Sequence, residues 1–155
     1  MRHFSKNKLI TVLAVAAWLS GCTTAAPGLK TTAGMSGDDL GCTIPTNCVT
    51  TVGSNAMLPL RFDGTVAAGL SQLRATLATF PEAVVTRADD QLVEVVFATR
   101  AGFKDTVLFR ADAADSKIDF RSRSDFGLYD FGKNRDRMTD FTARFAQQAR
   151  ERSSK

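Results

Sequence analysis

Histidine and tryptophan are almost absent from this 155-residue sequence, which has one of each. Both lie near the start, as His3 and Trp18, in a segment that we expect to be cleaved off. A mature chain without histidine cannot form a Ser-His-Asp triad or a Cys-His pair. It also lacks the commonest protein ligand for zinc, copper and non-haem iron. We therefore assign no catalytic residue, no metal ion and no cofactor to the chain.

The sequence also lacks a hydrophobic run long enough to span a membrane. Residues 9–19 form a short apolar stretch, well below the roughly 20 residues that a transmembrane helix needs. A basic head precedes this stretch and two small residues follow it, which is the order of a secretory signal peptide, placed at residues 1–21. Leu19-Ser20-Gly21-Cys22 resembles a bacterial lipobox, so Cys22 would carry the lipid and, after cleavage, become the acylated (palmitate-bearing) N-terminus. An uncleaved or conventionally cleaved signal peptide is the alternative.

Cleavage would also remove most of the excess positive charge. Three of the 20 Lys and Arg residues and none of the 16 Asp and Glu residues lie in residues 1–21, so the formal net charge would fall from +4 to +1. A basic footprint for nucleic acid is then missing, and we expect no nucleic-acid partner. A lipid on Cys22 predicts a membrane-anchored protein of the cell envelope. Thr23 stands after the cysteine in place of an Asp, which favours the outer membrane, facing the periplasm.

Only three cysteines are present, and lipid attachment would leave Cys42 and Cys48. In an oxidising compartment, their six-residue separation is compatible with a small disulfide loop. Two free thiols in a reducing setting are the alternative. Residues 22–41 are rich in Thr, Ala and Gly and show almost no apolar periodicity, so we expect a flexible tether.

Residues 42–150 have the size of one domain. Apolar residues spaced by three and four predict a helix from Val66 to Phe80, capped by Asp63 or Thr65 and ended by Pro81. A second stripe predicts a helix over residues 134–150, with Asn134 as its cap.

Between the two helices, alternating patterns predict four strands, at residues 83–87, 92–99, 106–111 and 117–123. The order helix, strands, helix indicates an α+β fold with an antiparallel sheet of about four strands and both helices packed on one face. Several charged residues should then form a solvated face with cross-strand pairs: Glu94, Arg110, Asp119 and Arg121.

One stretch carries a resemblance to a known family. In residues 121–137 the matching positions are Arg121, Ser122, Ser124, Gly127, Asp130, Gly132, Asn134, Arg135 and Arg137. Further matches are Cys42 with Asn47-Cys48-Val49, and Gly102-Phe103 with Asp105. The pattern resembles DUF1499, a domain of unknown function found in bacterial envelopes and plastids. Asp125 stands where that family usually has Arg, and Thr106 where it often has a second Asp. These two departures could compensate each other at one site.

The arginines of this stretch indicate a candidate site. Arg135 and Arg137 fall in the first turn of the predicted helix, where the helix dipole disfavours cations, so a negative group should lie nearby. The candidate ligand-binding or structural ion-pair residues are Arg121, Ser124, Asp130, Asn134, Arg135, Arg137 and Asp105. Gly127 and Gly132 should allow two tight turns beside them.

Three interpretations of this site are open. The first is an internal ion-pair network with Asp105, Asp130 or Asp136. The second is an anionic ligand, such as a phosphate, a lipid headgroup or a glycan carboxylate. The third is an enzyme in which Asp105 or Asp130 acts as general base with Ser124 or Tyr129.

The sequence therefore favours an exported lipoprotein that is a non-enzymatic binding or scaffolding module of the envelope. Its expected partners are the membrane, through the N-terminal lipid, and an anionic envelope ligand or another envelope protein. A carboxylate-based hydrolase acting on an envelope polymer or lipid is the alternative.

Overall fold

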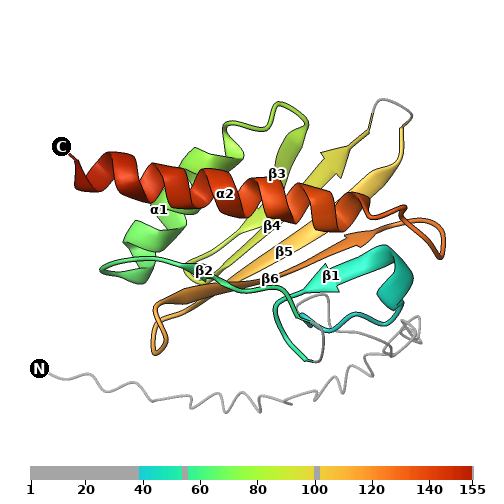
Figure 1. The fold of residues 1–155 in the computed structure, drawn as a ribbon, viewed down its shortest axis with the longest axis horizontal. Coiled ribbons are helices and arrows are strands. Elements are labelled where there is room, and N and C mark those ends of the chain that lie inside the picture. Colours follow the sequence, from blue (N-terminus) through green and yellow to red (C-terminus); the bar gives the residue numbers. More distant parts are fainter. Residues whose placement is uncertain (1–38, 54–55, 100–101, 155) are drawn as a thin grey trace, which may run out of the picture. The chain divides into compact units, whose positions relative to one another are not determined.

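Two helices cover one face of an antiparallel sheet in the computed structural model of the chain (Figure 1). The structure describes residues 39–53, 56–99 and 102–154, which belong to one compact unit. The predicted signal peptide, Cys22 and residues 22–38 of the predicted tether lie outside the described residues. Among the helices of the described part, none is long and apolar enough to cross a bilayer.

The sheet has six strands among the described residues, in the order β1-β6-β5-β4-β3, and β2 also pairs with β6. The elements follow one another as η1 (Pro45–Asn47), β1 (Cys48–Thr50), β2 (Leu60–Arg61), α1 (Val66–Leu77), β3 (Ala83–Ala88), β4 (Leu92–Ala98), β5 (Lys104–Asp112), β6 (Lys117–Ser124) and α2 (Lys133–Ser153). The predicted α+β class is confirmed. The predicted count of about four strands was too low, because β1 and β2 have three and two residues and are too short to show alternation.

Helix α1 begins after Thr65, whose side chain accepts a hydrogen bond from the Ala68 N–H at 3.2 Å. Of the two predicted caps, Thr65 is therefore the one used. The helix ends at Leu77, four residues before Pro81. Its apolar stripe faces the sheet, and Leu70, Leu73 and Leu77 are all at most 4% exposed.

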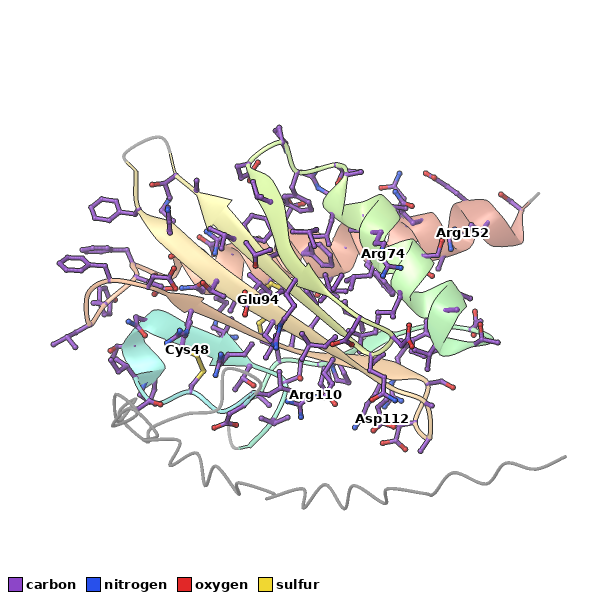
Figure 2. All side chains as sticks on the ribbon, turned by 180° about the vertical axis from the view of Figure 1, so that it is seen from behind. Cys48, Arg74, Glu94, Arg110, Asp112 and Arg152 are labelled. Carbon is purple, nitrogen blue, oxygen red and sulfur yellow. A yellow bond between two sulfur atoms is a disulfide. The ribbon has the colours of Figure 1, made fainter. Side chains whose placement is uncertain are left out.

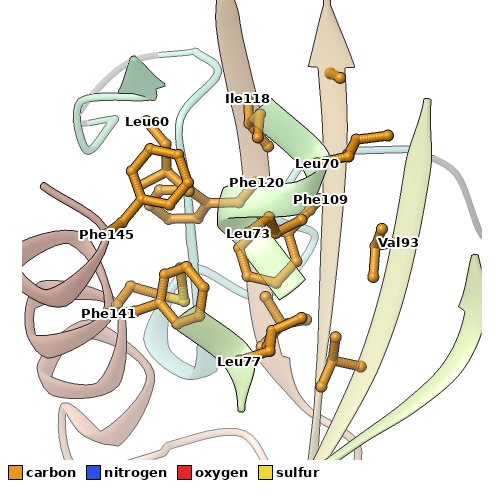
Figure 3. Packing of buried hydrophobic residues seen from close by; sticks show 14 of the residues in the cluster. Leu60, Leu70, Leu73, Leu77, Val93, Phe109, Ile118, Phe120, Phe141 and Phe145 are labelled. Carbon is orange, nitrogen blue, oxygen red and sulfur yellow. The ribbon is translucent and has the colours of Figure 1, made fainter. Parts of the chain in front are cut away.

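The core lies between the sheet and the helices (Figure 3). Phe109 and Phe120 extend from β5 and β6 toward α2, while Phe141 and Phe145 extend from α2 toward the sheet. The rings of Phe109 and Phe141 have centroids 5.1 Å apart. This aromatic contact fixes α2 across β5 and β6.

Helix α2 begins at Lys133, with Gly132 as its N-cap at φ 79°. The prediction that Asn134 caps this helix was wrong, because Asn134 lies inside the first turn and is fully buried. The helix also runs to Ser153, three residues further than predicted, and Arg150 and Arg152 in its last turn suit the negative end of the helix dipole.

Figure 2 shows the face of the sheet that the helices do not cover, and Glu94 and Arg110 lie on this face. The prediction that this whole face is solvated was wrong at Arg121, which is only 3% exposed. Leu40 packs with Leu92 and Leu108 into a small second cluster on this face. Burial lowers the pKa of Arg121, and the neighbouring Arg123 lowers it further.

Candidate binding site

A hydrogen-bonded carboxylate fixes the start of α2. Gly132 has no side chain that could cap the helix, and Asp130 takes this role. One oxygen of Asp130 accepts from the Gly132 N–H at 3.0 Å, and the other accepts from the Asn134 N–H at 2.8 Å. Burial by itself would raise the pKa of Asp130, but the hydrogen bonds from Asn134 and Gly132 outweigh it, so the pKa is lowered.

Asn134 joins the helix to two other segments of the chain. Its side-chain N–H donates to the Asn47 carbonyl at 3.1 Å and to Ser124 Oγ at 3.2 Å. Its side-chain oxygen accepts from Ser122 Oγ at 2.6 Å. This buried amide therefore ties α2 to β6 and to η1, a role that the sequence pattern of a helix cap did not reveal.

One turn after Asn134 on α2, Arg137 forms an ion pair with Asp105 of β5. The two side chains are only 13% and 5% exposed. The guanidinium also donates to Asn134 Oδ1 at 3.0 Å and lies 4.9 Å from the centre of the Phe97 ring. The negative group expected near this arginine is thus supplied from within the protein.

The structure brings together five of the seven candidate residues: Asp105, Ser124, Asp130, Asn134 and Arg137. The other two lie elsewhere. Arg121 lies on the opposite face of the sheet from Ser122 and Ser124, as the two-residue period of β6 requires. Arg135 is exposed on α2 and lines a different pocket, beside Cys42 and Cys48.

The two departures from the family pattern are in contact. Thr106 Oγ1 donates a hydrogen bond to a carboxylate oxygen of Asp125 at 2.7 Å. Since Thr106 lies on β5 and Asp125 follows β6, this contact links the ends of neighbouring strands. The Thr106 hydroxyl and the Asp125 carboxylate are therefore hydrogen-bonded to each other.

A pocket of about 440 Å³ opens beside the buried network. Asp105 and Ser124 contribute to its lining from the sheet, and Lys104 and Lys133 line it as well. Four aromatic side chains surround it, and we call them the aromatic rim: Phe103, Phe126, Tyr129 and Phe131. They are 57%, 79%, 61% and 81% exposed, respectively. Exposed apolar side chains gathered at one place make this pocket a candidate binding surface.

The loop that carries most of the rim is held by η1. The Asn47 side-chain amide donates to the Gly127 carbonyl at 2.5 Å, and the Thr46 hydroxyl donates to the Leu128 carbonyl. The Asp130 N–H in turn donates to the Thr46 carbonyl at 3.2 Å. The segment 42–48, which contains η1, is closed by the disulfide that the sequence predicted between Cys42 and Cys48. The loop backbone is therefore tied to a cross-linked turn.

The backbone of this loop turns as the sequence indicated, with one addition. Gly127 and Gly132 have φ values of 87° and 79°, which glycine adopts readily. Phe131 also has a positive φ, of 55°. For a residue with a side chain, this conformation costs on the order of 1–2 kcal/mol. The protein thus maintains an unfavourable backbone at an aromatic residue that is largely exposed.

The model of the family described as a protein of unknown function (DUF1499) matches residues 40–145. The chain belongs to this family. The match spans α1, all six strands of the described residues, the first part of α2 up to residue 145, and the residues of the buried network. The resemblance found in the sequence pattern is thereby confirmed at the level of the family. Neither the curated proteins nor the solved structures contain a match to this chain.

Sequence analysis missed two parts of this site, most of the aromatic rim and the role of Asn47. Of the aromatic rim it had singled out only Tyr129 as a candidate, although Phe126 and Phe131 stand in the same short loop. The signal was available, because large apolar residues in a glycine-containing loop without helix or strand periodicity have no element to place them in the core. Asn47 was quoted only as part of a family motif, and its contacts span about 80 residues of chain.

Proposed function

We propose that the chain is an exported lipoprotein of the cell envelope whose domain binds a partner at the aromatic rim and catalyses no reaction. The observation that carries this proposal is the rim itself, four aromatic side chains that are each more than half exposed around one pocket. Leaving them in water is unfavourable, by about 1.5–3 kcal/mol for each large apolar side chain that could be fully buried. A partner that covers the rim recovers this free energy.

The buried network supports a scaffolding role for the arginine-containing motif. Arg137 is already paired with Asp105, and Arg121 and Arg135 do not converge with it on one opening. An anionic ligand held jointly by these three arginines has no support in this arrangement. The network instead positions the loop that carries the rim.

The environments of the two candidate bases also support a function without catalysis. A general base works best when its pKa lies near the working pH. The hydrogen bonds that Asp130 accepts lower its pKa, away from neutral pH. Asp105 is 4% exposed and is paired with Arg137.

Binding at the rim can be tested with 1-anilinonaphthalene-8-sulfonate, an apolar probe with one anionic group. The protein to use is the chain from Thr23 onward, because the hydrophobic core, the sheet and the disulfide all lie after Gly34. We expect the folded chain to enhance the fluorescence of the probe, and the double variant Phe126→Ser, Phe131→Ser to lose at least nine tenths of the enhancement. An unchanged signal in a variant with a native circular-dichroism spectrum would refute binding at the rim.

A hydrolase acting on an envelope polymer or lipid is the second candidate, because Asp105, Ser124 and Asp130 line the same pocket. Incubation with phospholipid vesicles or peptidoglycan fragments, followed by mass spectrometry, tests it. A product that the unmodified chain forms and the Asp130→Asn variant does not form would favour the hydrolase. Without such a product, the binding module stands.

The envelope location rests on the lipobox. Labelling cells with an alkyne fatty acid should tag the unmodified protein, and Cys22→Ala should lose both the tag and the membrane fraction. A Cys22→Ala protein that is still tagged would refute lipid attachment at this cysteine.

A further inference from the structure

We propose that the aromatic rim inserts into the interface of a phospholipid membrane, so that the domain rests on the lipid surface with this end. This inference rests on the proposed binding function and names its partner. The rim side chains come from two loops, the β4–β5 hairpin and the β6–α2 loop, which lie at the same end of the sheet (Figure 1). Leu128, which is 73% exposed, adds a further apolar side chain from the second loop.

The backbone of the β6–α2 loop is prepared for an apolar surrounding. Backbone groups that enter a bilayer must find their hydrogen bonds within the protein, because the hydrocarbon offers none. The carbonyls of Gly127 and Leu128 accept from side chains of η1, and the Asp130 N–H donates to the Thr46 carbonyl. These bonds lower the number of loop backbone groups that would lose water without a partner when the loop enters the membrane interface.

The charges around the rim suit a lipid headgroup layer. Lys104 and Lys133 are exposed and line the same pocket as the aromatic side chains. Lysines in such positions extend their ammonium groups to the headgroups and are attracted to anionic lipids. The nearby acids are engaged with the protein, since Asp105 pairs with Arg137, Asp125 accepts from Thr106 and Asp130 accepts from the start of α2.

A lipid on Cys22 would hold the domain close to such a surface. Residues 23–38 separate this cysteine from the described chain, and even fully extended they span at most about 60 Å. The anchor would then raise the local concentration of membrane seen by the rim, so that a modest intrinsic affinity suffices.

The experiment uses the chain from Thr23 onward, without any lipid, and vesicles of phosphatidylcholine and phosphatidylglycerol. Tyr129 is the only tyrosine of the sequence and Trp18 is absent from this chain, so the intrinsic emission reports on the rim. We expect co-sedimentation with the vesicles and quenching of Tyr129 emission by lipids brominated on their acyl chains. Phe126→Ser with Phe131→Ser should lower the vesicle partition coefficient at least tenfold.

The matched control replaces two exposed valines on the edge strand β3, Val84→Ser with Val85→Ser. These side chains are 59% and 48% exposed, and the control should leave the partition coefficient unchanged. An equal loss in both double variants, or no partition of the unmodified chain, would overturn membrane insertion. If the phenylalanine variant fails to fold, the quenching of Tyr129 in the unmodified chain decides the question. An absence of quenching by brominated lipids would then overturn the proposal.

The two experiments distinguish failure of the membrane proposal from failure of the proposed binding function. Rim-dependent binding of the anilinonaphthalene probe without vesicle partition would leave the binding function and refute the lipid partner. Loss of both would refute the two proposals together.

Discussion

Replacing Arg137 by alanine should destabilise the fold strongly, because it leaves a buried carboxylate without its partner. The ion pair with Asp105 has side chains that are 13% and 5% exposed, so solvent screens it little. Removing one member of a buried pair costs about 3–5 kcal/mol. For a domain of this size, roughly 4 °C is lost per kcal/mol, so the midpoint of thermal unfolding should fall by roughly 12–20 °C.

Arg135→Ala is the matched control, two residues earlier on the same helix. Arg135 is exposed, and it forms no ion pair with any residue that the structure describes. Its replacement should change the free energy of unfolding by no more than about 0.5 kcal/mol. The assay is thermal and urea unfolding followed by circular dichroism. Equal midpoints for the Arg137→Ala and Arg135→Ala proteins would refute the structural role of the pair.

Two further predictions concern packing and pH. A Cβ added at Gly69 would lie 2.6 Å from Cγ of Phe62, so Gly69→Ala should lower the free energy of unfolding by about 1–3 kcal/mol despite the better helix propensity of alanine; a higher urea midpoint would contradict this. Because the folded pKa of Asp130 is lowered from 3.8, its carboxylate stabilises the fold above that value, and the stabilisation is lost as the pH falls through the folded pKa. Asp130→Asn should therefore be less stable than the unmodified chain at pH 7, and the difference in urea midpoint should shrink toward pH 2; a difference that is constant with pH would speak against it.

The periodic elements could be predicted from the sequence, because each long helix or strand repeats its own signal. The apolar stripe of α1 and the alternation of β6 are set by residues three, four or two positions apart. The strands β1 and β2 could not be predicted in this way, since their place is decided by pairing with β6 and not by their own pattern.

The start of α2 shows a second limit of sequence reasoning. Asn134 is a residue type that often caps helices, yet the cap function passes to Asp130, four residues earlier, and Asn134 turns inward. Asn134 turns toward the hydroxyls of Ser122 and Ser124, which no local pattern brings to this helix.

The candidate site could be predicted from the sequence only in part. An internal ion pair of Arg137 with Asp105 was among the interpretations that the sequence left open, and the structure contains it across 32 residues of chain. The aromatic rim is different, because exposure is a property of the folded surface. In the sequence, a phenylalanine of the core cannot be told from a phenylalanine of the rim. Only the folded arrangement of η1, the β4–β5 hairpin and the β6–α2 loop decides which of them are exposed.

The most direct test of the account is a nuclear magnetic resonance titration of the uniformly ¹⁵N-labelled chain from Thr23 onward with the anilinonaphthalene probe. The account predicts that the amide signals that shift belong to residues lining the pocket, such as Lys104, Gly127, Tyr129 and Lys133. Shifts that cluster instead around Arg121, Arg123 and Arg135, with the pocket signals unmoved, would contradict it.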